Sequence, residues 1–465
     1  METMKSVFYK YSHRLKSNRA IYTLLLLLPS ILIFIFLLKN GTQYCCDAVS
    51  YLHSIQGYQE NGLFHHIGSY GYRSYLFPFL YSLFPLNMSH TIEVFNISIL
   101  MYSLVSIALF LIIEYVVLYL FWGKRFFILF YTALFLNPLL MVYIAYPLQE
   151  SFFVLLFLLF IPLIFSAYVK KNSYLLLMLL GLFFSTMYMA RASHLLLLVP
   201  ILVIGLYYIY KSKQRKSLLF LVFILSSISF IVPQSLLMLK SFNTLNPYPK
   251  TSVLDMQFKY GNVYSKYGTN LSENPKLSAA QPYWNPLACS TEKSKDTRNI
   301  RSFECSVQNE SPVHDFTSLI QNNSFAQLFF KSSLHIFNAL NYDYFKPYVT
   351  SPPKLFSWHQ ILSMLLVFLG TYQIIKSYIL RQANAFDVFL DLIIVVTLGV
   401  CLFFAIETRF GLLATIVFSI KSMQLLLYNR PRGSEMIALA IGSFFFLLST
   451  SLLSVYILSL SGALN

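Results

Sequence analysis

The sequence predicts an all-α membrane protein with many transmembrane helices. Of its 465 residues, 57% are hydrophobic and only 11% are charged, a composition that is not typical of soluble domains. The apolar residues gather in runs of roughly 17 to 25, the length with which a helix crosses the hydrocarbon while satisfying its own backbone hydrogen bonds. We expect about eleven spans of this kind. They lie near residues 21–38, 92–121, 126–145, 151–168, 174–190, 194–210, 217–239, 357–380, 386–406, 410–428 and 434–458.

The positions of Lys and Arg predict that the N-terminus is cytoplasmic, because membrane proteins carry an excess of these residues in cytoplasmic loops. With this orientation every cytoplasmic connection is basic; the residues are Lys124 and Arg125, Lys170 and Lys171, the cluster from Lys211 to Lys216, Lys376 and Arg381, and Arg430 and Arg432. The net charge of +16 therefore reflects topology, and we expect no nucleic-acid partner. The first apolar run also lacks a small-residue cleavage site, so we expect it to be a retained span.

Two long segments then fall outside the cytoplasm. The second, 240–356, is polar and too long for a simple connector, so we expect a small extracytoplasmic loop domain. The predicted organisation is an N-terminal transmembrane module over 1–239 with a candidate catalytic loop at 39–91, then the loop domain, then C-terminal transmembrane helices over 357–465. Within the first loop, residues 75–86 are apolar but short and contain two prolines, which favours an interfacial or re-entrant helix over a span.

Cysteine and histidine give no metal-binding pattern. Cys289 and Cys305 both lie in the second outer segment, where oxidation is permitted, so a disulfide and two unrelated thiols are equally compatible with the sequence. His65 and His66 adjoin each other without the spacing of a known ligand set, and we predict no metal site. We predict no cofactor, and a requirement for a divalent metal stays open.

Acidic residues are scarce, so their positions are informative. Asp47 follows the first span, where a carboxylate could accept a proton from an acceptor hydroxyl, or could instead be the N-cap of a helix that begins at Ala48. Glu150 precedes a helix that begins near Ser151, a position where the helix dipole favours an acid. If the two loops converge, Asp47 and Glu150 would form a two-carboxylate site.

Basic residues near the ends of apolar runs are the candidate binding residues, since ionisable groups at such depth are usually paired or functional. Glu407 and Arg409 lie where two runs meet, and the guanidinium fork of Arg409 matches the oxygens of a lipid phosphate; the alternative is a local ion pair. For Arg191, with His194 one turn later, binding and structural interpretations are equally open. Arg73 lies among tyrosines that could hold a sugar or form an ordinary aromatic belt.

Together these features resemble the GT-C superfamily of polytopic glycosyltransferases, especially the protein-mannosyltransferase-like branch that uses polyprenyl-phosphate sugars. The resemblance rests on the predicted topology and on short motifs. They are Asp47 and Tyr51 in the early outer loop; Tyr72, Arg73, Tyr75 and Pro78; the sequence YPLQES, which ends with Glu150 and Ser151; and an E-x-R-[FY] element from Glu407 to Phe410.

The resemblance implies an inverting transfer of a sugar from a polyprenyl-phosphate donor to a hydroxyl of a glycan, lipid or protein. It implies that Asp47 is the catalytic base with Glu150 as a second acid, and that Arg409 and Arg191 hold the donor phosphate. The other motif residues expected to contact substrate are Tyr51, Arg73, His194 and Glu407. Residue usage hints at a bacterium, so the expected location is the inner membrane, with the active site facing the periplasm or the exterior.

Three alternatives stay open. A transporter or a flippase of lipid-linked oligosaccharides should have internal repeats or charged residues at mid-membrane. Instead, Glu114, Asp387 and Asp391 lie near the ends of expected spans, so we expect them to be structural. A polysaccharide polymerase or ligase would depend on residues 240–356 rather than on Asp47. A membrane protein without enzymatic activity is the third alternative.

Overall fold

The structure is a computed structural model in which the described residues form helices and no strands. It describes residues 47–62, 73–83, 105, 108, 109, 112, 149–249, 325–340, 358–402, 411–427, 429 and 431–460. For this part of the chain the predicted all-α class is confirmed. The chain divides into two compact units, which are treated separately: unit 1 contains residues 1–249 and 384–389, and unit 2 contains residues 250–383 and 390–465. Of the predicted loop domain only residues 240–249 and 325–340 are described, so its existence stays a prediction.

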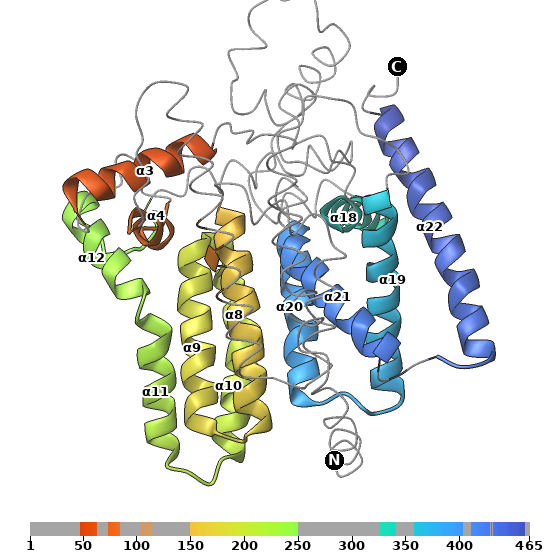
Figure 1. The fold of residues 1–465 in the computed structure, drawn as a ribbon, viewed down its shortest axis with the longest axis horizontal. Helices are drawn as coiled ribbons and strands as arrows, with labels where there is room; N and C mark the ends of the chain where they lie inside the picture. Colours follow the sequence, from red (N-terminus) through yellow and green to blue (C-terminus); the bar gives the residue numbers. More distant parts are fainter. Residues whose placement is uncertain are drawn as a thin grey trace, which may run out of the picture. The chain divides into compact units, whose positions relative to one another are not determined.

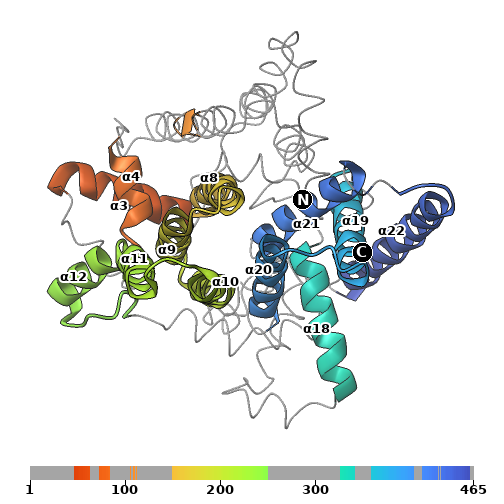
Figure 2. The same ribbon diagram turned by 90° about the horizontal axis from the view of Figure 1, so that it is seen from below.

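Unit 1 contains a group of apolar helices with shorter helices at one end. The helices are α3 (Asp47–Asn61), α4 (Leu76–Ser82), α8 (Gln149–Val169), α9 (Ser173–Ala190), the 3-10 helix η2 (Ala192–Leu197), α10 (Leu198–Lys211), α11 (Lys216–Ile228) and α12 (Ile231–Phe242). Helices α8 to α11 run side by side, and α3 lies across one end of them together with α4 and α12 (Figures 1 and 2). This end of unit 1 carries most of the predicted site residues that the structure describes.

Local sequence explains the turn and the close packing between these helices. Asn172 caps α9, because its Oδ1 accepts a hydrogen bond from the backbone N–H of Leu175 at 3.1 Å. Helix α9 crosses α11 at Gly181, where an added Cβ would lie 2.0 Å from Ser226 Oγ and 2.8 Å from the Phe223 carbonyl oxygen. Ser185, one turn further along α9, donates to the Ser226 carbonyl at 3.2 Å. Small residues thus let the two backbones approach closely, as is common between transmembrane helices.

Unit 2 contains α18 (Phe325–Leu340), α19 (Trp358–Ile379), α21 (Leu412–Leu427), α22 (Ser434–Leu460) and most of α20 (Ala385–Cys401). Helix α21 crosses α19 obliquely (Figure 1), and at the crossing a Cβ on Gly370 would lie 2.6 Å from the Phe418 carbonyl oxygen. Nearby, Ser422 Oγ donates to the Leu366 carbonyl at 2.6 Å. The same use of small residues therefore holds together the central helices of both units.

The number of membrane spans is confirmed only in part. Among the described residues, five helices are long and apolar enough to cross a membrane, or six if α11 and α12, which are bent by 47° at their junction, count as one span. The five are Gln149–Val169, Ser173–Ala190, Ala192–Lys211, Gln360–Ile379 and Ser434–Val455. Such a set is typical of a multi-pass integral membrane protein. The predicted spans at 21–38 and 126–145, and nearly all of 92–121, lie outside the described residues, so the total of eleven and the orientation stay predictions.

The short apolar segment of the first loop forms helix α4, which has seven residues. At about 1.5 Å per residue this helix is roughly 10 Å long, about a third of the hydrocarbon thickness. It therefore does not span, as the sequence predicts. Its residues Leu76, Phe77, Pro78 and Tyr81 are buried.

Candidate functional site

The candidate site lies at the end of unit 1 where α8 begins and α9 ends. These two helix ends are adjacent because the helices are antiparallel neighbours; α4 packs against α9, and α3 packs against α4 (Figure 1). The ring of Phe77 in α4 joins the parts: its centroid lies 5.0 Å from that of Tyr51 in α3 and 5.6 Å from that of Phe152 in α8. Residues from the early loop and from the second predicted acidic loop therefore share one end of the unit.

Glu150 and Arg191 form an ion pair at this end. Glu150 lies in the first turn of α8, and Arg191 is the residue that follows α9. The distance from Arg191 Nη1 to Glu150 Oε1 is 2.9 Å, and the side chains are 17% and 3% exposed. Because Oε1 of Glu150 is engaged by the guanidinium, the carboxylate orients Arg191. A guanidinium has five N–H donors in a fixed fork, a geometry that suits carboxylate and phosphate oxygens.

His194 lies in the 3-10 helix η2, one turn after Arg191. Its Nδ1 is 3.0 Å from the Met187 carbonyl oxygen, and its ring meets that of Phe153 edge-on at a centroid distance of 4.9 Å. These contacts give His194 a packing role between α8 and α9. Direct contact with substrate, the role predicted for His194, stays untested.

Tyr51 and Arg73 lie together, although 22 positions separate them in the chain. The Arg73 guanidinium carbon lies 4.2 Å from the centroid of the Tyr51 ring, which is a cation–π contact, and Arg73 and Tyr51 are 5% and 4% exposed.

Two other tyrosines of this region are buried. Burial raises the pKa of Tyr75 to about 12, and it also raises the pKa of Tyr58. Both phenols therefore stay protonated well above neutral pH.

Gln234 and Tyr248 belong to the same region but were not among the predicted site residues. Gln234, in α12, is fully buried, and its side-chain amide binds main-chain groups of Arg73, Tyr75 and Pro247. Tyr248 donates its hydroxyl hydrogen to the Tyr188 carbonyl at 2.8 Å. The available signal was an amide inside the apolar run 217–239, since a polar group at such a position needs a partner.

Several predicted residues cannot be placed in the site. Asp47 is the first residue of α3, one position from the helix start expected at Ala48, but its side chain is not among those described. Glu407 and Arg409 lie outside the described residues, as do Cys289 and Cys305. Among the described residues, no group of three His, Cys, Asp or Glu side chains could hold a metal ion.

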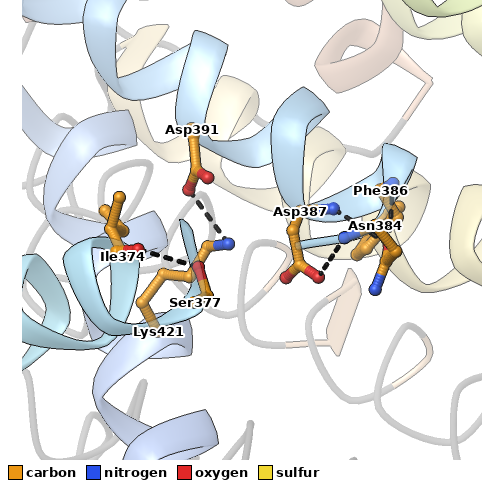
Figure 3. Close-up of polar contacts among 7 residues, drawn as sticks. All are labelled: Ile374, Ser377, Asn384, Phe386, Asp387, Asp391 and Lys421. Carbon is orange, nitrogen blue, oxygen red and sulfur yellow. Dashed lines mark hydrogen bonds and ion pairs between the residues drawn. The ribbon is translucent and has the colours of Figure 1, made fainter. Parts of the chain in front are cut away.

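Unit 2 contains a separate buried ion pair, drawn in Figure 3. Lys421 Nζ of α21 lies 2.9 Å from Asp391 Oδ1 of α20, and the side chains are 1% and 11% exposed. Asp391 was expected to be structural, near the end of a span, and its partner is a lysine within helix α21. Figure 3 also shows Asn384 and Asp387, which belong to unit 1. Asp387 Oδ2 accepts a hydrogen bond from the backbone N–H of Asn384 at 3.2 Å, and Asn384 Oδ1 accepts one from the backbone N–H of Asp387, also at 3.2 Å. This reciprocal capping box gives Asp387 the structural role that was expected.

The end of unit 1 thus combines an arginine held by a carboxylate with a second arginine held on a tyrosine ring. Guanidinium groups match the geometry of phosphate oxygens, and aromatic faces can stack on sugars. No protein-family model, curated protein or solved structure matches this chain.

Proposed function

We propose that the protein is a membrane glycosyltransferase of the GT-C type, which moves a sugar from a polyprenyl-phosphate donor to an acceptor hydroxyl. The acceptor is a glycan, a lipid or a protein, and the transfer inverts the configuration at the anomeric carbon. The proposed site faces the extracytoplasmic side of a bacterial inner membrane, where a flipped lipid-linked sugar is available without nucleotide. No nucleic acid or cofactor takes part in the proposed reaction.

One observation carries the proposal: Arg73 and Arg191 lie at the same end of unit 1, joined through α3, α4 and α8. Arg191 is oriented by Glu150 at 2.9 Å, and Arg73 lies over Tyr51 at 4.2 Å. A lipid phosphate at a membrane surface needs this kind of partner, because its negative charge is costly to place beside apolar helices without cations. Helix α3, which carries Tyr51, begins at Asp47.

In the proposed reaction Asp47 accepts the proton of the acceptor hydroxyl. The hydroxyl oxygen then forms a bond to the anomeric carbon while the bond from that carbon to the phosphate oxygen breaks. Polyprenyl phosphate leaves with the electron pair, and the arginines stabilise its additional negative charge. Because Glu150 is engaged with Arg191, we assign it the task of orienting that arginine. Glu407 and Arg409 are proposed as further contacts to the donor.

The test is transfer of radiolabelled sugar from polyprenyl-phosphate sugars in membranes that contain matched amounts of wild type or Asp47→Asn. The exposed acid Glu60 lies in the same helix, so Glu60→Gln is a control with the same change of charge. We expect Asp47→Asn to lose about a hundredfold or more of the transfer rate, as for a general base, and Glu60→Gln to retain it. Equal transfer by wild type and Asp47→Asn would remove Asp47 from the mechanism, and no transfer by wild type would refute the proposal.

A transporter or flippase is the second candidate, and the ion pair between Asp391 and Lys421 favours it. Charged pairs inside a helical membrane unit occur along ion and substrate pathways. Reconstituted vesicles with a fluorescent lipid-linked sugar would test it. Flipping that is lost in the double variant Lys421→Met with Asp391→Leu, which keeps no uncompensated charge, but kept in Asp47→Asn would support transport. Sugar transfer lost in Asp47→Asn supports the glycosyltransferase.

A further inference from the structure

We infer that Gln234 is a positioning residue, which holds Arg73 in place to bind the donor phosphate by fixing the main chain on both sides of Ser74. The inference rests on the proposed function, and it assigns a task to a residue outside the predicted site. Gln234 belongs to α12, whereas Arg73 lies in the loop before α4, so the two are 161 positions apart in the chain.

The side-chain amide of Gln234 makes three hydrogen bonds. Its Oε1 accepts from the backbone N–H of Tyr75 at 2.9 Å. Its Nε2 donates to the carbonyl oxygen of Arg73 at 3.1 Å and to that of Pro247 at 2.9 Å. Two N–H donors and one acceptor oxygen are thus all in use, on a residue with no exposed surface. Such a fully satisfied buried amide specifies one arrangement of the groups that it binds.

The Gln234 hydrogen bonds restrict the direction in which the Arg73 side chain leaves the backbone. Binding the carbonyl of Arg73 and the N–H of Tyr75 fixes the peptide groups on either side of Ser74. An arginine side chain has several rotatable bonds and loses conformational entropy when it binds a ligand. A fixed backbone reduces the entropy that is still to be lost when Arg73 binds a phosphate. The Tyr51 ring, 4.2 Å from the guanidinium carbon, then limits the guanidinium itself.

The third hydrogen bond, to the Pro247 carbonyl, connects the main chain at Arg73 with helix α9, which ends just before Arg191. Pro247 is followed by Tyr248, whose hydroxyl donates to the Tyr188 carbonyl at 2.8 Å and whose ring meets the Tyr188 ring at 5.3 Å. Tyr188 lies in the last turn of α9, three residues before Arg191. Gln234 therefore links the main chain of one proposed phosphate-binding arginine to the helix that carries the other.

The competing interpretation is a purely structural connection between two loops. A structural connection would weaken the protein generally, whatever residue stands at position 73. A positioning residue acts through Arg73, so its removal should have no further effect on phosphate binding once Arg73 is absent. The double-mutant cycle therefore distinguishes the two roles.

The experiment measures binding of radiolabelled polyprenyl phosphate to the purified full chain in lipid nanodiscs. The variants are Gln234→Met, which has nearly the same shape but no hydrogen bonds, Gln234→Glu, which keeps an acceptor for Tyr75, Arg73→Ala, and the double variant Arg73→Ala with Gln234→Met. The control is Gln214→Leu, at an exposed glutamine outside the site. Amide hydrogen exchange of the peptide that contains Tyr75 reports the Gln234 contact independently of any ligand.

We expect Gln234→Met to weaken binding about tenfold, the equivalent of one or two lost hydrogen bonds, and to raise exchange at Tyr75. In the Arg73→Ala background the same change should leave affinity within about twofold. We expect Gln234→Glu to keep the protection of Tyr75 but to weaken binding, because both carbonyl contacts lose their donor.

Three results would overturn the inference while leaving the proposed function intact. They are wild-type affinity in Gln234→Met, an equal loss of affinity with and without Arg73, and unchanged exchange at Tyr75. If wild type and Gln214→Leu both fail to bind polyprenyl phosphate, the proposed function fails, and the inference fails with it. The two failures are distinguishable, because failure of the proposed function appears in the wild type, whereas failure of the inference alone appears only in the variants.

Discussion

Glu150 Oε1 and Arg191 Nη1 lie 2.9 Å apart and join the first turn of α8 to the residue that ends α9. The α9 backbone closes there, since the N–H of Arg191 donates to the Met187 carbonyl at 3.0 Å. The pair therefore connects two neighbouring helices at the end that carries the candidate site. Glu150 should therefore contribute to the stability of the protein, and this contribution can be measured without an activity assay.

Replacing Glu150 by alanine should destabilise unit 1. The change leaves Arg191 without its carboxylate while 83% of its side chain is covered, and removing one partner of a buried pair costs about 3 kcal/mol. We expect a lower midpoint of thermal unfolding for the purified full chain in detergent. Glu150→Gln keeps the shape and a hydrogen-bond acceptor, so its loss should be smaller.

The control for this prediction is Glu60→Ala, at an exposed acid of α3. A surface change of this kind usually alters stability by less than about 0.5 kcal/mol. Equal unfolding midpoints for Glu150→Ala and Glu60→Ala would contradict the structural importance of the pair.

The ion pair between Lys421 and Asp391 predicts a non-additive pair of substitutions. Lys421→Met alone leaves the Asp391 carboxylate without this lysine inside unit 2, where such a loss costs about 3–5 kcal/mol. The double variant Lys421→Met with Asp391→Leu removes both charges, so we expect it to regain most of the stability. Thermal unfolding of wild type, Lys421→Met, Asp391→Leu and the double variant gives the coupling energy between the two side chains.

Activity measured on the same four proteins separates packing from function. If the double variant recovers its stability and also its sugar transfer or lipid flipping, the pair is structural. Recovered stability without recovered activity would identify the pair as part of the working site. A double variant no more stable than Lys421→Met would show that the two charges do not compensate each other.

Hydropathy could predict where helices lie but not how they bend. The expected spans 151–168 and 174–190 agree with α8 and α9 to within two residues, because a span must be a continuous apolar run. The run 217–239 was expected to be one span, and the structure has two helices at 47°. The hydroxyls of Ser226 and Ser227 bond to carbonyls three or four residues earlier, a contact that often bends helices. The serines were visible in the sequence, but the angle was not.

Part of the site could be predicted and part could not. Residue chemistry identified Glu150, Arg191 and Arg73 one at a time, because charges in an apolar chain are few, whereas Tyr51 was named only through the family resemblance. Their pairing depends on which helix ends meet, and sequence spacing does not contain that information. Gln234 was missed because a single amide forms no motif, and its three partners are main-chain groups that any residues could supply.

Gly→Ala changes should have opposite effects at two glycines, Gly181 at the crossing of α9 and α11 and Gly399 in α20. At Gly181 a Cβ would lie 2.8 Å from the Phe223 carbonyl oxygen and 2.0 Å from Ser226 Oγ, so the helices must move apart. Such overpacking costs about 1–3 kcal/mol. At Gly399, inside α20, a Cβ would meet no atom of the described residues within 4 Å, so alanine should stabilise that helix by about 0.5–1 kcal/mol.

Thermal unfolding of Gly181→Ala and Gly399→Ala in the same detergent tests this contrast. Adding Ser226→Ala to Gly181→Ala removes the hydroxyl oxygen at 2.0 Å but leaves the Phe223 carbonyl in place, so we expect only partial recovery. A rise in the unfolding midpoint for Gly181→Ala, equal to that for Gly399→Ala, would mean that α9 and α11 do not cross as closely as the structure has them. Because Ser185 bonds to Ser226 at the same crossing, Ser185→Val should repeat the loss seen for Gly181→Ala.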